Sequence, residues 1–160
     1  MVSDQKIIEA DYLKAGYIYN LANFVLWPQN VFNFSVSPFL IGLYGNKEIK
    51  TAIISSLRDK KIQNREWKVG LFDSVKSIGH CHLIFISGSN LSEASQLIKE
   101  FNKKPILLLA DNINGFCKEG GMVNLVGNFP NFGYQVNTNA INQGRLKLQP
   151  EFLELATIIE

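Results

Sequence analysis

The chain has 160 residues, of which 46% are hydrophobic and 19% are charged, and its formal net charge is +2. These values are typical of one folded domain and exclude a disordered chain, so we expect a single domain over residues 1–160. No Lys/Arg-rich segment alternates with aromatic residues, which argues against nucleic-acid binding. The longest apolar runs, VGLF, LIFI and PILLLA, are too short to span a bilayer, so direct membrane insertion is not expected.

The first predicted element is a long helix that Ser3 or Asp4 can cap and that ends at Trp27, before Pro28. The first ten residues, MVSDQKIIEA, contain no apolar core of the kind found in signal peptides. Two interpretations stay open: a cytoplasmic protein, or a mature secreted chain whose leader has been removed.

Behind this helix, apolar runs of strand length alternate with helical patterns. The pattern predicts strands at 39–45, 67–73, 82–87, 105–111, 120–128 and 133–139, helices at 47–61, 91–104 and 150–159, and a helical turn at 75–78. Asn90 is the expected cap of the helix at 91–104, with Glu93 in the reciprocal position of a capping box.

Near-continuous apolar strands that alternate with helices indicate a parallel sheet covered on both faces. The short connection FPNF between the last two strands leaves no room for a crossover helix and therefore predicts an antiparallel hairpin. The predicted fold is α/β: a three-layer sandwich whose mixed, mostly parallel sheet has about six strands, an antiparallel edge hairpin, and helices on both faces.

The first helix carries two apolar faces. One suits packing on a sheet and joins Ala10, Leu13, Tyr17, Ile18, Leu21, Phe24 and Val25. The other, called the second stripe below, has the spacing of a helix–helix seam and joins Ile8, Tyr12, Ala15, Tyr19, Ala22 and Leu26. Either a neighbouring helix of the same chain covers the second stripe, for example the C-terminal one, or the stripe binds a second copy or another protein.

Residue types that perform chemistry are few and scattered. GLYGNK lacks the third glycine of a dinucleotide turn, and His80 and His82 share one side of a strand but lack the third ligand that zinc needs. Asp73 and Asp111 end their strands at the edge where α/β sheets bind ligands, yet no nucleophile accompanies them. We therefore expect no catalytic residue, no metal and no cofactor.

Two further features are open to more than one interpretation. Gly120 and Gly121, before Met122, allow a turn that aims the hairpin, or else an edge that a partner approaches closely. Cys81 and Cys117 are predicted at opposite ends of neighbouring parallel strands, farther apart than a disulfide can span, so two unpaired thiols are expected.

Five segments resemble, in the same order, those of the YfiR-like family of small bacterial periplasmic proteins. They are KAGYIYNLANFVLWP, FLIGLYG, CHLIFIS, GFCKEGGMVNLV and YQVNTNAINQGRLKLQPEFLELA, and they extend from the first helix to the last. The resemblance implies a secreted, non-enzymatic α/β domain that forms a homodimer and whose leader has been removed. It also implies binding to the periplasmic sensory domain of a membrane-bound diguanylate cyclase, which holds the cyclase inactive in c-di-GMP signalling and biofilm control.

The chain departs from this family at its cysteines. The family commonly has cysteine at the position of Gly42, and that cysteine can pair with the one at Cys81. Here the pairing that the resemblance implies is lost. Cys117 stands where the family usually has another residue.

The predicted partner-binding residues are Ile8, Tyr12, Tyr19, Leu26, Gly120, Gly121 and Met122. We expect Tyr19→Glu to abolish the oligomer or the complex without unfolding the monomer. The alternative function is a periplasmic small-ligand-binding module without a cyclase partner, with its ligand near Asp73, Ser87 and Asp111. A zinc enzyme that uses the two histidines is a third possibility.

Overall fold

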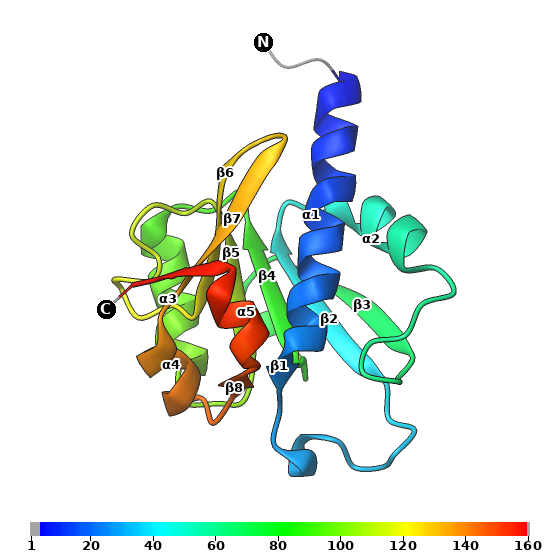
Figure 1. Ribbon diagram of the computed structural model, residues 1–160, viewed down its shortest axis with the longest axis vertical. Coiled ribbons are helices and arrows are strands. Elements are labelled where there is room, and N and C mark those ends of the chain that lie inside the picture. Colours follow the sequence, from blue (N-terminus) through cyan, green and yellow to red (C-terminus); the bar gives the residue numbers. More distant parts are fainter. Residues whose placement is uncertain (1–3, 160) are drawn as a thin grey trace.

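The computed structural model describes the backbone of residues 4–159 and the side chains of residues 9–159. Its main sheet has seven strands in the order β3-β2-β4-β5-β6-β7-β9, and neighbouring strands are parallel except for the β6–β7 hairpin (Figure 1). The strands are β2 (Phe39–Gly45), β3 (Trp67–Phe72), β4 (Leu83–Ser87), β5 (Leu107–Asp111), β6 (Val123–Asn128), β7 (Asn131–Val136) and β9 (Ala156–Ile158). The predicted α/β fold with a mostly parallel sheet is confirmed.

Helices cover both faces of this sheet (Figure 1). One face carries α1 (Asp4–Phe24), α2 (Ile49–Leu57), α4 (Thr138–Gln143) and α5 (Pro150–Glu154), and the other carries α3 (Leu91–Phe101). Short 3-10 helices lie at η1 (Gln29–Val31) and η2 (Val75–Ser77). A separate two-stranded sheet pairs β1 (Val25–Leu26) with β8 (Lys147–Leu148) in antiparallel fashion.

The central strand β4 shows why the sheet needs both helical layers. All five of its side chains are buried. Leu83 and Phe85 join the core beneath α1 and α2, whereas Ile84 and Ile86 join the core beneath α3. Because side chains alternate along a strand, an apolar run without polar interruptions must be covered on both faces.

Helix α1 uses its first face as predicted. Ile18 and Leu21 have no exposed surface and belong to the larger core, as does Val25 directly after the helix. Two reciprocal hydrogen bonds tie the helix to the hairpin: the Tyr17 hydroxyl donates to the Phe132 carbonyl at 3.0 Å, and the Tyr134 hydroxyl donates to the Tyr17 carbonyl at 2.7 Å. These bonds fix how far α1 stands from β7.

Two segments predicted as helix are strands. Val25–Leu26 leaves α1 and pairs with β8, so Leu26 is not a helical residue. The predicted C-terminal helix stops at Glu154, and β9 follows, parallel to β7 and outside the hairpin. In both places a neighbouring strand offers unpaired backbone groups, as the Val136 carbonyl does by accepting the Ile159 N–H at 2.8 Å. Helix α4, which was not predicted, follows the hairpin.

Candidate functional site

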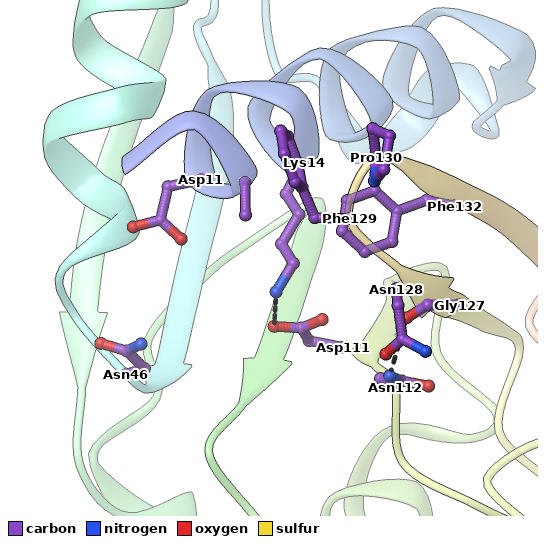
Figure 2. A pocket seen from close by; sticks show the side chains of 11 residues that line it. Asp11, Lys14, Asn46, Asp111, Asn112, Gly127, Asn128, Phe129, Pro130 and Phe132 are labelled. Carbon is purple, nitrogen blue, oxygen red and sulfur yellow. Dashed lines mark hydrogen bonds and ion pairs between the residues drawn. The ribbon is translucent and has the colours of Figure 1, made fainter. Parts of the chain in front are cut away.

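A pocket of about 790 Å³ lies between the N-terminal half of α1 and the tip of the β6–β7 hairpin, over the carboxyl ends of β2 and β5 (Figure 2). Its described lining residues are Ala10, Asp11, Lys14, Asn46, Asp111, Asn112, Gly127, Asn128, Phe129, Pro130 and Phe132. The carboxyl edge of a parallel sheet is where α/β proteins place their ligands. Topology thus brings residues that are far apart in sequence to one half-open site of ligand size.

An ion pair crosses the middle of the pocket. Lys14 Nζ donates to Asp111 Oδ2 at 3.0 Å, and the two side chains are only 19% and 16% exposed (Figure 2). Asp111 is the last residue of β5, whereas Lys14 lies at the middle of α1. Because the pair is largely shielded from water, it fixes the height of α1 above the sheet more firmly than a surface pair would.

Asp11 is one turn before Lys14 on α1, and it lines the pocket on the side where Asn46 lies (Figure 2). Burial raises its pKa, Lys14 opposes that shift, and the carboxylates of Asp111 and Glu48 raise the pKa further. Among the described side chains, no cation lies within 4.0 Å of the Asp11 carboxylate. The charge of Asp11 is therefore only partly compensated.

The opposite wall is apolar and belongs to the hairpin tip. Phe129, Pro130 and Phe132 line it, and the Lys14 ammonium lies 5.5 Å from the centre of the Phe132 ring. Asn112 Nδ2 donates to the Gly127 carbonyl at 3.0 Å and so holds the base of the hairpin tip against the end of β5. The pocket has a carboxylate at one end and aromatic rings at the other.

The structure separates the three strand-end residues that the alternative function invoked. Asp111 lies in the pocket, Ser87 is buried and donates to the Asn46 carbonyl at 3.3 Å, and Asp73 is exposed beyond the end of β3. Sequence reasoning missed Asp11 and Lys14. Their spacing of three on a helix otherwise taken as apolar was a signal that both project from the same side.

The second stripe is divided by the fold. Ala15 and Ala22 are fully buried in the larger core, and α2 is the helix packed extensively against α1. The C-terminal helix α5 contacts α1 through Phe24, which is not part of the stripe. The hydroxyl of Tyr19 donates to the Lys61 carbonyl at 3.2 Å, and Lys60 Nζ lies 5.2 Å from the centre of its ring. The helix–helix seam is thus largely internal.

Among the described residues of the second stripe, Tyr12 and Leu26 are exposed, whereas Tyr19 is partly buried. Tyr12 is 40% exposed and Leu26 is 45% exposed. The side chain of Ile8 lies outside the described residues. A contact with a partner would use Tyr12 and Leu26 and would not extend continuously between them.

The Gly120–Met122 segment lies inside the fold and not along a free edge. Met122 is 1% exposed, and β6 behind it pairs with β5 on one side and β7 on the other. A Cβ at Gly121 would overlap the Phe116 ring, and Gly120 has a φ of +108°, which favours glycine. The glycines therefore serve a tight turn, and the Met122 side chain offers no accessible surface.

The HCH segment lies at the opposite end of β4 from the pocket. The rings of His80 and His82 are 4.9 Å apart between centroids, and Leu40 N donates to His82 Nδ1 at 2.9 Å. In the described part of the chain, no third His, Cys, Asp or Glu joins them to form a metal-binding group. Cys81 and Cys117 are both buried free thiols, and burial raises the pKa of Cys81 to about 11 and that of Cys117 to about 12.

The fold and the pocket together define a three-layer α/β domain with a half-open site at its strand ends. The chain belongs to the YfiR/HmsC-like family, whose model matches residues 11–157. At the level of the family, this membership supports regulation of diguanylate cyclase signalling from the periplasm. No curated protein matches the chain. Over residues 4–159, none of the helices has both the length and the apolarity needed to cross a membrane.

Proposed function

We propose that the protein is a periplasmic regulator that binds the sensory domain of a membrane-bound diguanylate cyclase and inhibits the cyclase without catalysing a reaction itself. The observation that carries this proposal is the family match over residues 11–157. The match begins within α1 and ends in β9, so it includes the described lining residues of the pocket except Ala10, and most of the helix that carries the second stripe.

The proposed contact surface is the exposed part of the second stripe. An exposed tyrosine beside a buried helix–helix seam is a typical anchor of a protein interface, because its ring contributes area and its hydroxyl can bond a partner. We propose that Tyr12 and Leu26 contact the cyclase domain or a second copy of the chain in a homodimer. Tyr19 is a poorer target for mutation than its sequence position suggests, because it also supports the connection after α2.

The first experiment is a calorimetric titration of the purified chain with the periplasmic domain of a diguanylate cyclase encoded beside its gene. We expect saturable binding at micromolar concentrations. Tyr12→Glu and Leu26→Glu should each weaken that binding at least tenfold, because each puts a charge into the contact. Sedimentation of the same variants tests whether this surface also holds a homodimer together.

Val36→Glu is the matched control, because it places the same charge on a side chain that is 84% exposed and outside the second stripe. Circular dichroism must show that all three variants are folded. Binding that persists unchanged in both stripe variants would move the interface elsewhere. No heat at tens of micromolar with folded wild type would overturn the cyclase partner and favour the small-ligand module.

A further inference from the structure

We propose that the pocket between α1 and the β6–β7 hairpin binds a small organic ammonium ion, with the charged group beside Asp11 and an apolar body against Phe129 and Phe132. The inference concerns the pocket alone and stands whether or not the chain binds a cyclase. It goes beyond the expectation of a ligand at the strand ends, because it names the chemistry of the ligand and the residues that select it.

The charge balance of the pocket selects a cation. Lys14 is the only ammonium among the described lining residues, and it is already paired with Asp111. Asp11 has no ion-pair partner within 4.0 Å among the described side chains. Lys14 attracts its charge from farther away, whereas the Asp111 and Glu48 carboxylates repel it. A ligand ammonium beside Asp11 would relieve this repulsion, whereas an anion would meet an excess of carboxylates.

The shape and the apolar wall select an organic body. A volume of about 790 Å³ greatly exceeds what a metal ion or a single water needs and falls in the range of small-molecule sites. Phe129, Pro130 and Phe132 present apolar surface on the side away from Asp11 (Figure 2). An aromatic or alkyl group can pack there while its ammonium reaches the carboxylate.

The ring of Phe132 already has an ammonium near it, that of Lys14 at 5.5 Å from the centroid. Rings attract cations through the negative charge of their faces. Lys14 also attracts the Asp11 carboxylate, although it is paired with Asp111. Its positive charge would therefore repel a ligand ammonium held beside Asp11. This makes Lys14 a competitor of the ligand and not its binding partner.

Phenethylamine is the probe, because it joins one ammonium to one phenyl ring. Calorimetric titration of the full chain at pH 7 should give saturable binding with a submillimolar Kd that weakens as salt is added. Phenethyl alcohol, which keeps the ring and lacks the charge, and 3-phenylpropanoate, which reverses the charge, should each bind at least tenfold more weakly.

Two variants should move the affinity for phenethylamine in opposite directions. Asp11→Asn removes the uncompensated carboxylate and should weaken binding at least tenfold. Lys14→Met frees Asp111 and removes the competing ammonium, so it should strengthen binding. Glu119→Gln is the matched control, because it makes the same change of charge in a different surface region beside α3 and should leave the affinity unchanged.

The Asp11 carboxyl gives a second readout that does not depend on heat. Its pKa, followed by NMR, should fall when phenethylamine binds, because a nearby cation favours the ionised form. The proposal is overturned if folded wild type shows no saturable binding at millimolar phenethylamine. It is equally overturned if phenethyl alcohol binds as well as the amine, or if folded Lys14→Met loses binding, which would show that Lys14 helps to form the site and does not compete with the ligand.

Discussion

The imidazole of His82 is 1% exposed and lies between aromatic rings, with Phe32 stacked at 4.4 Å and Phe39 at 5.3 Å between centroids. Nδ1 accepts a hydrogen bond from Leu40 N–H, so the neutral ring carries its hydrogen on Nε2. Nε2 is buried and has no hydrogen-bond partner among the described residues. A protonated ring would therefore bury a charge that nothing nearby neutralises.

Acid should destabilise the fold through His82. Burial lowers its pKa to about 4, and the charges of His80 and Arg65 disfavour its proton further, outweighing the opposite effect of the Val31 backbone. The unfolded chain binds this proton near pH 6.5, so its contribution to stability is complete above pH 6.5 and is lost as the pH falls toward 4. We expect the free energy of unfolding to fall by up to about 1.4 kcal/mol per pH unit in that window.

Urea unfolding of wild type and His82→Gln at several pH values between 4 and 7 measures this effect. The glutamine oxygen can still accept from Leu40 N–H but cannot titrate, so the variant should lose most of the slope. Equal slopes in the two proteins would assign the acid sensitivity to carboxylates instead.

Gly42 in β2 lies close to Cys81, which precedes β4. A Cβ built on Gly42 would lie 2.8 Å from Cys81 Sγ and 3.2 Å from a carbon of the Phe72 ring. Such proximity suits a disulfide. We predict that Gly42→Cys bonds to Cys81 and raises the free energy of unfolding by up to about 4 kcal/mol relative to its reduced form, because it closes the loop over residues 42–81.

Oxidation should be slow in the folded chain, since the raised pKa of Cys81 leaves little thiolate at neutral pH. The bond is best formed during folding in an oxidising compartment, and a count of free thiols after denaturation detects it. Gly42→Ser supplies a side chain of similar size that cannot bond. After oxidation, the Gly42→Cys variant should have one free thiol, that of Cys117. Three free thiols would contradict the predicted bond and the short distance between Gly42 and Cys81.

At the scale of the elements, α3 begins at Leu91, as its local sequence predicted. The Asn90 side chain accepts a hydrogen bond from Glu93 N at 2.9 Å, which satisfies one of the unpaired N–H groups at the helix start. Asn90→Ala should lower the free energy of unfolding by about 1 kcal/mol. Ser92→Ala, at an exposed position in the same turn, is the control for urea unfolding and should have little effect. If both variants lose the same free energy of unfolding, the Asn90 cap does not stabilise the helix specifically.

Elements fixed by their own residues could be predicted, and elements fixed by a distant strand could not. β2 matches its predicted bounds because FLIGLYG is apolar throughout, and the β6–β7 hairpin follows from its short connection. The residues of β9 fit a helical pattern, yet the open edge of β7 makes them extended. No local signal carries that information, because register with β7 depends on residues more than twenty positions away.

The candidate site was predictable only at its sheet edge. Asp111 could be expected there because it ends an apolar strand. The contributions of Asp11 and Lys14 required knowing which side of α1 faces the carboxyl ends of the strands. Met122, predicted among the partner-binding residues, is buried for a related reason, since β6 pairs with strands on both sides.

At the scale of the whole molecule, α1 joins the two proposed functions. Its N-terminal half carries Asp11 and Lys14 in the pocket, and Tyr12 stands between them in sequence at the surface. A ligand ammonium beside Asp11 would act on the same turn of α1 that carries Tyr12 in the proposed contact with a partner. Titrating the cyclase domain with phenethylamine present at saturation should therefore change its affinity, whereas an unchanged affinity would make the two sites independent.

The reciprocal hydrogen bonds between Tyr17 and the hairpin also bear on the order in which the chain can fold. They join positions 115 and 117 residues apart. Because α1 is synthesised well before β7, the side of α1 that faces the hairpin stays uncovered until those later strands are made. Such long-range closure slows folding and leaves the helix exposed to aggregation in the meantime. A chain interrupted before residue 131 would have a complete α1 and nothing from β7 or β9 to cover it.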